Sequence, residues 1–186
     1  MWGIDPPPLS HNQSLNAMAH FIPTLFLLLK RLFLPVLLPT WWQDLLLLIP
    51  RVLCGYLLAF DFGAAKFGLP WSPPDNNLGL FEVAYWFPND VAEYGGVFAQ
   101  FSAFFAWMGA FSEAVGGLFL LLGLLTRPFA FLIICTMLVA IVCQQLQNGL
   151  WNALPAAGFL WVALYNLILG SGRFGLDYVI TKKLIR

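Results

Sequence analysis

Apolar residues in this chain are gathered into runs of about 20, which is the length of helix that crosses a bilayer. The connections after the second and third runs are very short, so neighbouring helices must be antiparallel. The pattern therefore predicts an all-α membrane protein built on a four-transmembrane-helix antiparallel bundle, with an N-terminal interfacial segment. The four predicted spans are residues 45–65, 97–125, 128–146 and 153–170.

The apolar stretch 21–42 does not fit the spanning pattern. Lys30 and Arg31 divide it, three prolines interrupt it, and neither half is long enough to cross a membrane. We interpret it as a segment that lies on the membrane surface, with Trp41 and Trp42 at the level of the headgroups. A kinked or re-entrant segment is the alternative.

Composition supports the membrane assignment and limits the number of domains. The 186 residues are 60% hydrophobic and 10% charged, against about 45–50% and 25% in soluble domains. The formal net charge is zero and no basic run is present, which argues against nucleic-acid binding. We expect three parts: a tail with its interfacial amphipathic segment at 1–44, one membrane domain at 45–178, and a basic cytoplasmic tail at 179–186.

The basic residues predict the orientation. Cytoplasmic loops of membrane proteins carry an excess of Lys and Arg. If the amino terminus is cytoplasmic, the opposite side carries Lys66 alone, so both termini are expected in the cytoplasm. The eight cations on the cytoplasmic side are then Lys30, Arg31, Arg51, Arg127, Arg173, Lys182, Lys183 and Arg186.

Glu113 lies inside the predicted second span and is the first candidate for a functional site. A carboxylate in hydrocarbon costs several kcal/mol unless it is paired, protonated or in contact with water. Glu113 is fourteen residues from Arg127, a helical distance of about 21 Å. Lys66 is fifteen residues from Arg51, about 22 Å on the antiparallel helix before it. The two side chains are therefore expected at a similar depth, as an ion pair.

Asp61 precedes Lys66 by one to two helical turns and is a further candidate partner for the cation. Gly109, Gly116 and Gly123 recur every seven residues around Glu113, and small residues allow helices to approach closely. Three interpretations of Glu113 remain open. It is half of an ion pair that fixes helix register, it is a proton-responsive or ligand-binding carboxylate, or it is protonated and hydrogen-bonded to a neighbour.

A second polar cluster is expected at the cytoplasmic ends of the spans. Arg173 and Asp177 follow the last span, and Asp177 is within reach of Arg51 or Arg127. We interpret these four residues as a structural clamp at the level of the headgroups.

The order and helix placement of these landmarks resemble the DoxX family of small four-helix membrane proteins. The quoted pieces are Arg51-x-x-x-Gly55, Gly63-x-x-Lys66, Glu113-x-x-Gly116-Gly117 leading to Leu122-Gly123-Leu124-Leu125-Thr126-Arg127, and Gly170-Ser171-Gly172-Arg173-Phe174-Gly175-Leu176-Asp177, with Ser171 where proline is common.

The resemblance implies a four-helix bundle in the bacterial cytoplasmic (inner) membrane and an accessory role in a membrane redox assembly that uses a quinone. Residues 1–44 lie outside the resemblance, and the 66–96 loop is long for the family. Both are candidates for contact with membrane or peripheral protein subunits.

The residues limit the redox chemistry that the chain itself performs. The only histidines, His11 and His20, precede the spans, and no cysteine cluster suited to iron–sulfur binding is present. We therefore expect no intrinsic redox metal, with a quinone as the possible cofactor near Glu113, Lys66 and Asp61. A non-catalytic scaffold or assembly factor is the alternative function, and a small transporter is less favoured because no inverted repeat is evident.

Overall fold

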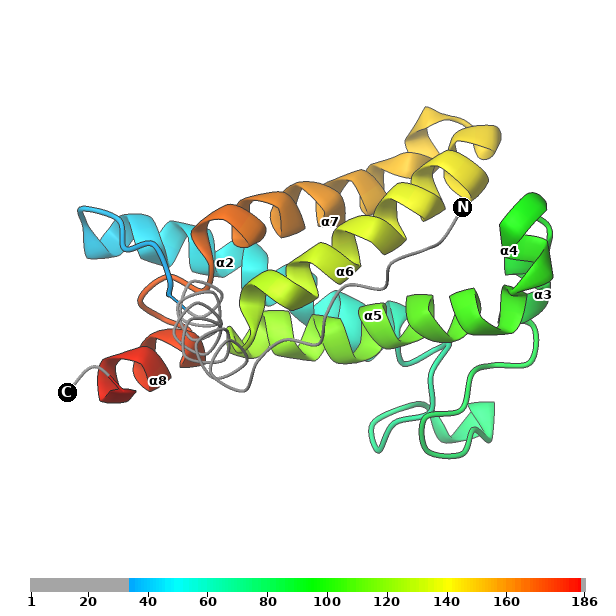
Figure 1. The fold of residues 1–186 in the computed structure, drawn as a ribbon, viewed down its shortest axis with the longest axis horizontal. Coiled ribbons are helices and arrows are strands. Elements are labelled where there is room, and N and C mark those ends of the chain that lie inside the picture. The colour runs from blue at the N-terminus through cyan, green and yellow to red at the C-terminus, as the bar shows by residue number, and fades with distance from the viewer. Residues whose placement is uncertain (1–33, 185–186) are drawn as a thin grey trace, which may run out of the picture. The chain divides into compact units, whose positions relative to one another are not determined.

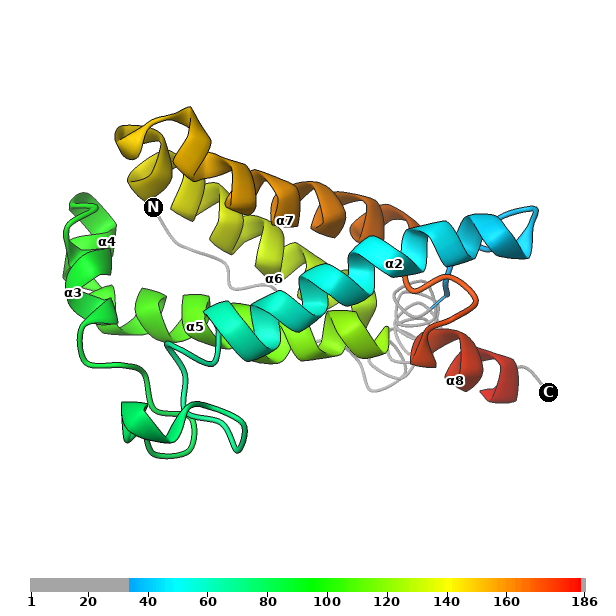
Figure 2. The ribbon, with the colours of Figure 1, turned by 180° about the vertical axis from the view of Figure 1, so that it is seen from behind.

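The computed structural model describes residues 34–184. Within this range the chain forms a bundle of four long helices, which confirms the predicted all-α membrane fold (Figure 1, Figure 2). Each long helix has the length and apolar composition needed to cross a membrane. They are α2 (Trp41–Leu57) with its π-helical end η1 (Leu58–Phe62), α5 (Ser102–Leu122), α6 (Thr126–Val139) with its π-helical end η3 (Ala140–Gln145) and the 3-10 turn η4 (Leu146–Asn148), and α7 (Leu150–Leu169).

The first spanning helix begins earlier than the sequence pattern indicated. Trp41 and Trp42, expected in an interfacial segment, are the first two residues of α2. Pro39 precedes this start, and the Gln43 side chain accepts a hydrogen bond from the Thr40 N–H at 3.3 Å. Such a bond satisfies a backbone donor at the helix entrance. The rest of the proposed interfacial segment, up to residue 33, lies outside the described residues.

The connection between α2 and α5 contains more structure than a simple loop. It includes the 3-10 turn η2 (Pro74–Asn76), an isolated antiparallel bridge between Phe67 and Val83, and the short helices α3 (Phe87–Ala92) and α4 (Gly96–Gln100). A bend at Phe101 (φ −122°, ψ 37°) separates α4 from α5. The predicted span 97–125 is therefore shorter in the structure, and α3 and α4 lie at the end of the bundle that we call the loop end (Figure 1).

Residues after α7 form a helix where we expected a basic tail. Helix α8 (Leu176–Leu184) follows α7 at the end of the bundle opposite α3 and α4, which we call the clamp end (Figure 1). Leu176, Val179 and Ile180 are exposed at helical spacing, and Asp177 is buried. This apolar exposed stripe is typical of a helix that lies along a membrane surface.

Helices α2 and α5 approach closely where glycines face each other. A Cβ on Gly117 would lie 2.7 Å from the Ala59 nitrogen, and one on Gly55 would lie 2.7 Å from the Leu121 nitrogen. Small residues thus permit the approach, as the sequence indicated. The glycine at the contact is Gly117, whereas the predicted Gly116 faces α6.

Two apolar clusters form the core of the described chain. One joins α6 and α7 with Leu58 and Leu120, and the other gathers at the loop end around Phe67, Phe87 and Ala110. The second cluster surrounds the region into which Glu113 projects, so it determines the environment of the candidate site.

Candidate functional site

Lys66 and Glu113 meet inside the bundle. The Lys66 Nζ and Glu113 Oε2 atoms are 2.6 Å apart, and the side-chain exposures are 21% and 6%. Ala110, about one turn before Glu113, and Ala114, the residue after it, are both fully buried and leave room for the carboxylate. The ammonium group also lies 5.0 Å from the centre of the Phe87 ring, which is within the range of a cation–π contact. The depth estimated from helical rise therefore places both partners correctly.

Asp61, the third residue of the predicted constellation, lies apart from this pair. Its side chain is exposed in η1, and the ion pair of Lys66 in the described structure is made with Glu113. Asp61 lies in the π-helical segment η1, whereas Lys66 lies in the turn that follows it, so helical spacing does not bring the two side chains together. The expected sharing of the cation is not observed.

A pocket of about 360 Å³ lies beside the ion pair, between α5 and α6 and under α3 and α4. We call it the α5–α6 pocket. Lys66 and Glu113 form part of its wall, and Phe87, Tyr94, Phe105 and other apolar side chains form most of the rest. At its rim, Phe104 is 60% exposed and Cys135 is also exposed, so the pocket opens toward the bilayer.

Hydroxyl groups add a second polar feature to the pocket wall. The Ser112 and Thr136 hydroxyl oxygens are hydrogen-bonded at 3.0 Å, and Thr136 donates to the Leu132 carbonyl at 3.1 Å. Burial raises the pKa of Tyr94 to about 12, with contributions from Asp90 and other acidic groups. The Tyr94 phenol, which also lines the pocket, is therefore protonated at neutral pH.

The loop end of α6 departs from α-helical geometry where it borders the pocket. Ala140 and Gln144, both within the π-helical segment η3, contribute to the pocket lining. Irregular π-helical turns occur frequently at functional sites. This irregularity brings an amide side chain to an otherwise apolar opening.

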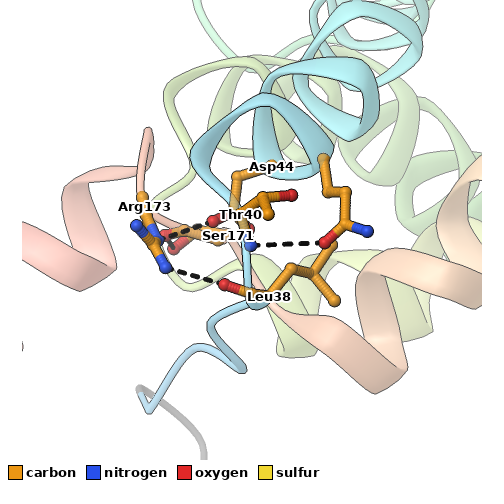
Figure 3. Close-up of polar contacts among 7 residues, drawn as sticks. Leu38, Thr40, Asp44, Ser171 and Arg173 are labelled. Atoms are coloured by element: carbon orange, nitrogen blue, oxygen red, sulfur yellow. Dashed lines mark hydrogen bonds and ion pairs between the residues drawn. The ribbon is translucent and has the colours of Figure 1, made fainter.

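The predicted clamp at the other end of the bundle contains an ion pair that the sequence analysis did not include. Arg173 Nε lies 2.8 Å from Asp44 Oδ2, and Arg173 also donates to the Leu38 carbonyl at 2.7 Å (Figure 3). Asp44 is 4% exposed. The contact joins the segment after α7 to the beginning of α2.

The other three predicted clamp residues bind backbone groups. Arg51 donates to the Ser171 and Phe174 carbonyls, and Arg127 donates to the Ile168 carbonyl at 3.1 Å. Asp177 binds the start of α6, where it accepts hydrogen bonds from Leu125 N–H at 2.8 Å, Thr126 N–H at 3.0 Å and the Thr126 hydroxyl at 2.8 Å.

The sequence of the DoxX family matches residues 46–145, more than half of the chain, and these residues include both halves of the ion pair. The chain belongs to the DoxX family. The glycine-rich piece at residues 170–177, which also carries the resemblance, lies beyond the matched range of this DoxX protein. Comparison with curated proteins and with solved structures gave no significant match.

The sequence prediction did not include three features of the two polar clusters. They are the Asp44 carboxylate, the Ser112–Thr136 hydroxyl pair, and the contribution of Phe87 on α3 to the pocket wall. Asp44 could have been noticed as an acid within the first turn of a spanning helix. The other two depend on which side chains face each other across helices. Within residues 34–184, no three His, Cys, Asp or Glu side chains gather into a potential metal site.

Proposed function

We propose that this DoxX-family protein is an accessory subunit of a membrane redox assembly and that its α5–α6 pocket binds the ring of a membrane quinone. One observation carries the proposal. A largely apolar pocket of about 360 Å³ opens beside an ion pair in the membrane domain, of which the carboxylate is buried and the ammonium partly buried. Apolar pockets with a few placed polar groups are the usual form of small-molecule sites.

The residues of the pocket fit the chemistry of a quinone. Lys66 has three N–H donors, of which Glu113 accepts one, so donors remain for a ligand carbonyl oxygen. Glu113 supplies an acceptor for a ligand hydroxyl, and the aromatic rings of Phe87 and Phe105 supply apolar walls. A bound quinone would supply two-electron redox chemistry, and the electron-carrying groups would belong to partner subunits.

The exposed rim supports entry from the bilayer. Phe104 and Cys135 border the opening and are exposed on the lipid-facing side of α5 and α6. A quinone with a long isoprenoid tail dissolves in the hydrocarbon layer, so a lateral opening suits it. The ring would lie near Glu113 while the tail remained among lipid chains.

We further propose the bacterial cytoplasmic membrane as the location, with the clamp end and both termini in the cytoplasm. Arg51, Arg127 and Arg173 gather at that end, and Lys182 and Lys183 follow on α8. Among residues 34–184, Lys66 is the basic residue at the other side. This asymmetry agrees with the excess of cations on cytoplasmic faces.

The alternative function is a scaffold, and the geometry of the ion pair favours it in one respect. The Lys66 ammonium and the Glu113 carboxylate form a direct ion pair at 2.6 Å. A buried pair of this kind contributes little net stability but can specify one register of packed helices. In that case the ion pair would fix the register of η1 and α5, and the rigid bundle would present a binding surface to a partner protein.

The experiment begins with gentle purification of the native assembly, followed by measurement of bound quinone and of co-purifying redox subunits. The variant Glu113→Gln then tests the site, with Glu93→Gln as a matched control because Glu93 is exposed and does not line the pocket. We expect Glu113→Gln to lower bound quinone and quinone-dependent turnover at least about tenfold with the assembly intact, as removal of a ligand-binding group implies.

The two functions predict different losses. Disappearance of the partner subunits from the Glu113→Gln preparation would favour the scaffold. Full turnover and normal quinone content in that variant would contradict the quinone site. The Glu93→Gln assembly is expected to match the wild type in both measurements.

A further inference from the structure

The loop between α2 and α3 lies beside α5 and does not simply extend beyond the bundle (Figure 1, Figure 2). The Trp107 indole N–H donates to the Phe81 carbonyl at 3.3 Å. The Phe67 ring packs edge-on against both Trp107 and Phe111, with centroid distances of 5.8 and 6.2 Å. The loop is therefore attached to the side of a membrane-spanning helix.

The depth of this attachment follows from the helical rise. The Ser112–Thr136 hydroxyl contact sets a common level in α5 and α6. From that level Trp107 is five residues toward the loop end, about 7.5 Å, and the first polar side chain of the α6–α7 turn, Gln144, is eight residues away, about 12 Å. The backbone of Trp107, whose indole binds the Phe81 carbonyl, thus lies about 4–5 Å nearer the bilayer centre than that of Gln144.

Large apolar side chains of the loop are exposed. Leu80 is 66% exposed, Phe81 49%, Tyr85 87% and Trp86 37%. Phe81 is bonded through its carbonyl to Trp107, which is itself exposed on α5. The exposed apolar surface of the loop is therefore continuous with the surface that α5 presents to lipid.

The backbone of the loop meets the main requirement for contact with lipid, because its two arms are paired. Gly68 N–H donates to Glu82 O and Gly68 O accepts from Phe81 N–H, both at 2.8 Å, and Ala84 N–H donates to Lys66 O at 2.9 Å. Unpaired backbone groups are costly away from water, so such pairing is needed near hydrocarbon.

Side chains of the loop also satisfy carbonyls at the end of α2. The Trp71 indole N–H donates to the Ala59 carbonyl at 3.1 Å, and the Asn76 amide donates to the Ala64 and Ala65 carbonyls at 3.4 and 3.3 Å. The last carbonyls of a helix otherwise require water or another partner. The loop thus replaces water at this helix end.

We infer that the loop 66–86 is a lipid-contacting hairpin whose Leu80, Phe81, Tyr85 and Trp86 side chains insert among the lipids of the leaflet at the loop end. The partner is the interfacial layer of the bilayer itself, where aromatic side chains are favoured. Glu82 is compatible with this layer because its carboxylate accepts a hydrogen bond from the Gly79 N–H at 2.7 Å.

The inference gives the long loop a role distinct from docking of a protein partner. In this role the loop keeps its first residue, Lys66, at the depth of Glu113. The bundle fixes Glu113, and the lipid layer fixes the hairpin that follows Lys66.

Photo-crosslinking in native membranes tests the inference on the full-length chain. The photoreactive residue p-benzoylphenylalanine is introduced separately in place of Leu80, Tyr85, Asp75 and Trp161. Asp75 is an exposed loop residue that serves as the aqueous control. Trp161, 72% exposed in the middle of α7, is the positive control for lipid contact.

After irradiation, adducts are identified by mass spectrometry. We expect lipid adducts at positions 80, 85 and 161, and at least about tenfold less at position 75. Protein adducts at positions 80 and 85, or no adduct there while position 161 reacts with lipid, would overturn the inference. Neither result bears on quinone binding, so the pocket proposal stands or falls separately.

Discussion

Asp177 connects the segment after α7 to the start of α6 through groups that otherwise lack partners within their helix. It is 2% exposed and accepts hydrogen bonds from Leu125 N–H, Thr126 N–H and the Thr126 hydroxyl. The first N–H groups of a helix have no intrahelical acceptor, and the helix dipole favours a negative charge at this position. Asp177 therefore acts as an N-terminal cap supplied from a distant part of the chain.

The first prediction concerns this cap at the residue scale. Asp177→Asn preserves the size of the side chain but removes its charge. It also replaces one accepting oxygen with an NH₂ group, which cannot accept a hydrogen bond from a backbone N–H. Loss of a cap costs about 0.5–2 kcal/mol, which corresponds to a Tm lower by about 1–8 °C for a chain of this size. Thermal unfolding of the purified protein in lipid nanodiscs, followed by tryptophan fluorescence, measures the shift.

Asp75→Asn is the matched control because Asp75 is exposed in the loop. We expect its Tm to equal that of the wild type. A normal Tm for Asp177→Asn would show that the three hydrogen bonds do not stabilise the junction.

At the residue scale, depth along a helix was the informative sequence signal. Counting residues from Arg51 and Arg127 put Lys66 and Glu113 at one level, and they lie 2.6 Å apart. The same counting did not exclude Asp61, because depth says nothing about direction around the helix. It also could not assign Asp177 to backbone N–H groups, since their availability depends on where α6 begins.

At the element scale, the contact between α2 and α5 depends on the absence of side-chain atoms. A Cβ at Gly117 would lie 2.7 Å from the Ala59 nitrogen and 2.8 Å from the Leu58 Cβ. The first of these neighbours is backbone, so the clash cannot be relieved by a side-chain rotation. One added methyl group would separate η1 from α5.

The second prediction compares two glycines. Gly117→Ala is expected to destabilise the protein by about 1–3 kcal/mol, which is the usual cost of overpacking. Gly158→Ala on α7 is the control, because its Cβ would meet nothing within 4 Å. Thermal unfolding of both variants gives the comparison, and equal Tm values would contradict the described helix packing.

Element existence was predictable and element ends were not. Runs of about 20 apolar residues identified all four spans, because the bilayer imposes that length on helices. The bend at Phe101, the π-helical ends of α2 and α6, and the pairing of the loop arms are set by contacts between elements. Hydropathy has no information about such contacts, so the 66–96 segment was predicted only as a long loop.

At the scale of the whole molecule, the bundle places a charged pair at one wall of an apolar, laterally open pocket. The apolar runs predicted the bundle, and a quinone near Glu113, Lys66 and Asp61 was expected from these polar residues together with the family resemblance. The extent of the pocket between α5 and α6, under α3, followed only from the three-dimensional arrangement. The central claim is that this pocket binds a quinone.

Equilibrium binding of a radiolabelled short-tailed quinone to the protein in lipid nanodiscs tests this claim most directly, with empty nanodiscs subtracted. Cys135→Trp fills the pocket rim without altering Lys66 or Glu113, and Leu138→Trp is the control, because Leu138 is exposed on α6 but does not line the pocket. The account predicts saturable binding by the wild type and Leu138→Trp, and at least about tenfold weaker binding by Cys135→Trp, a loss of about 1.4 kcal/mol or more. Absence of saturable binding by the wild type, or equal affinity in all three proteins, would contradict it.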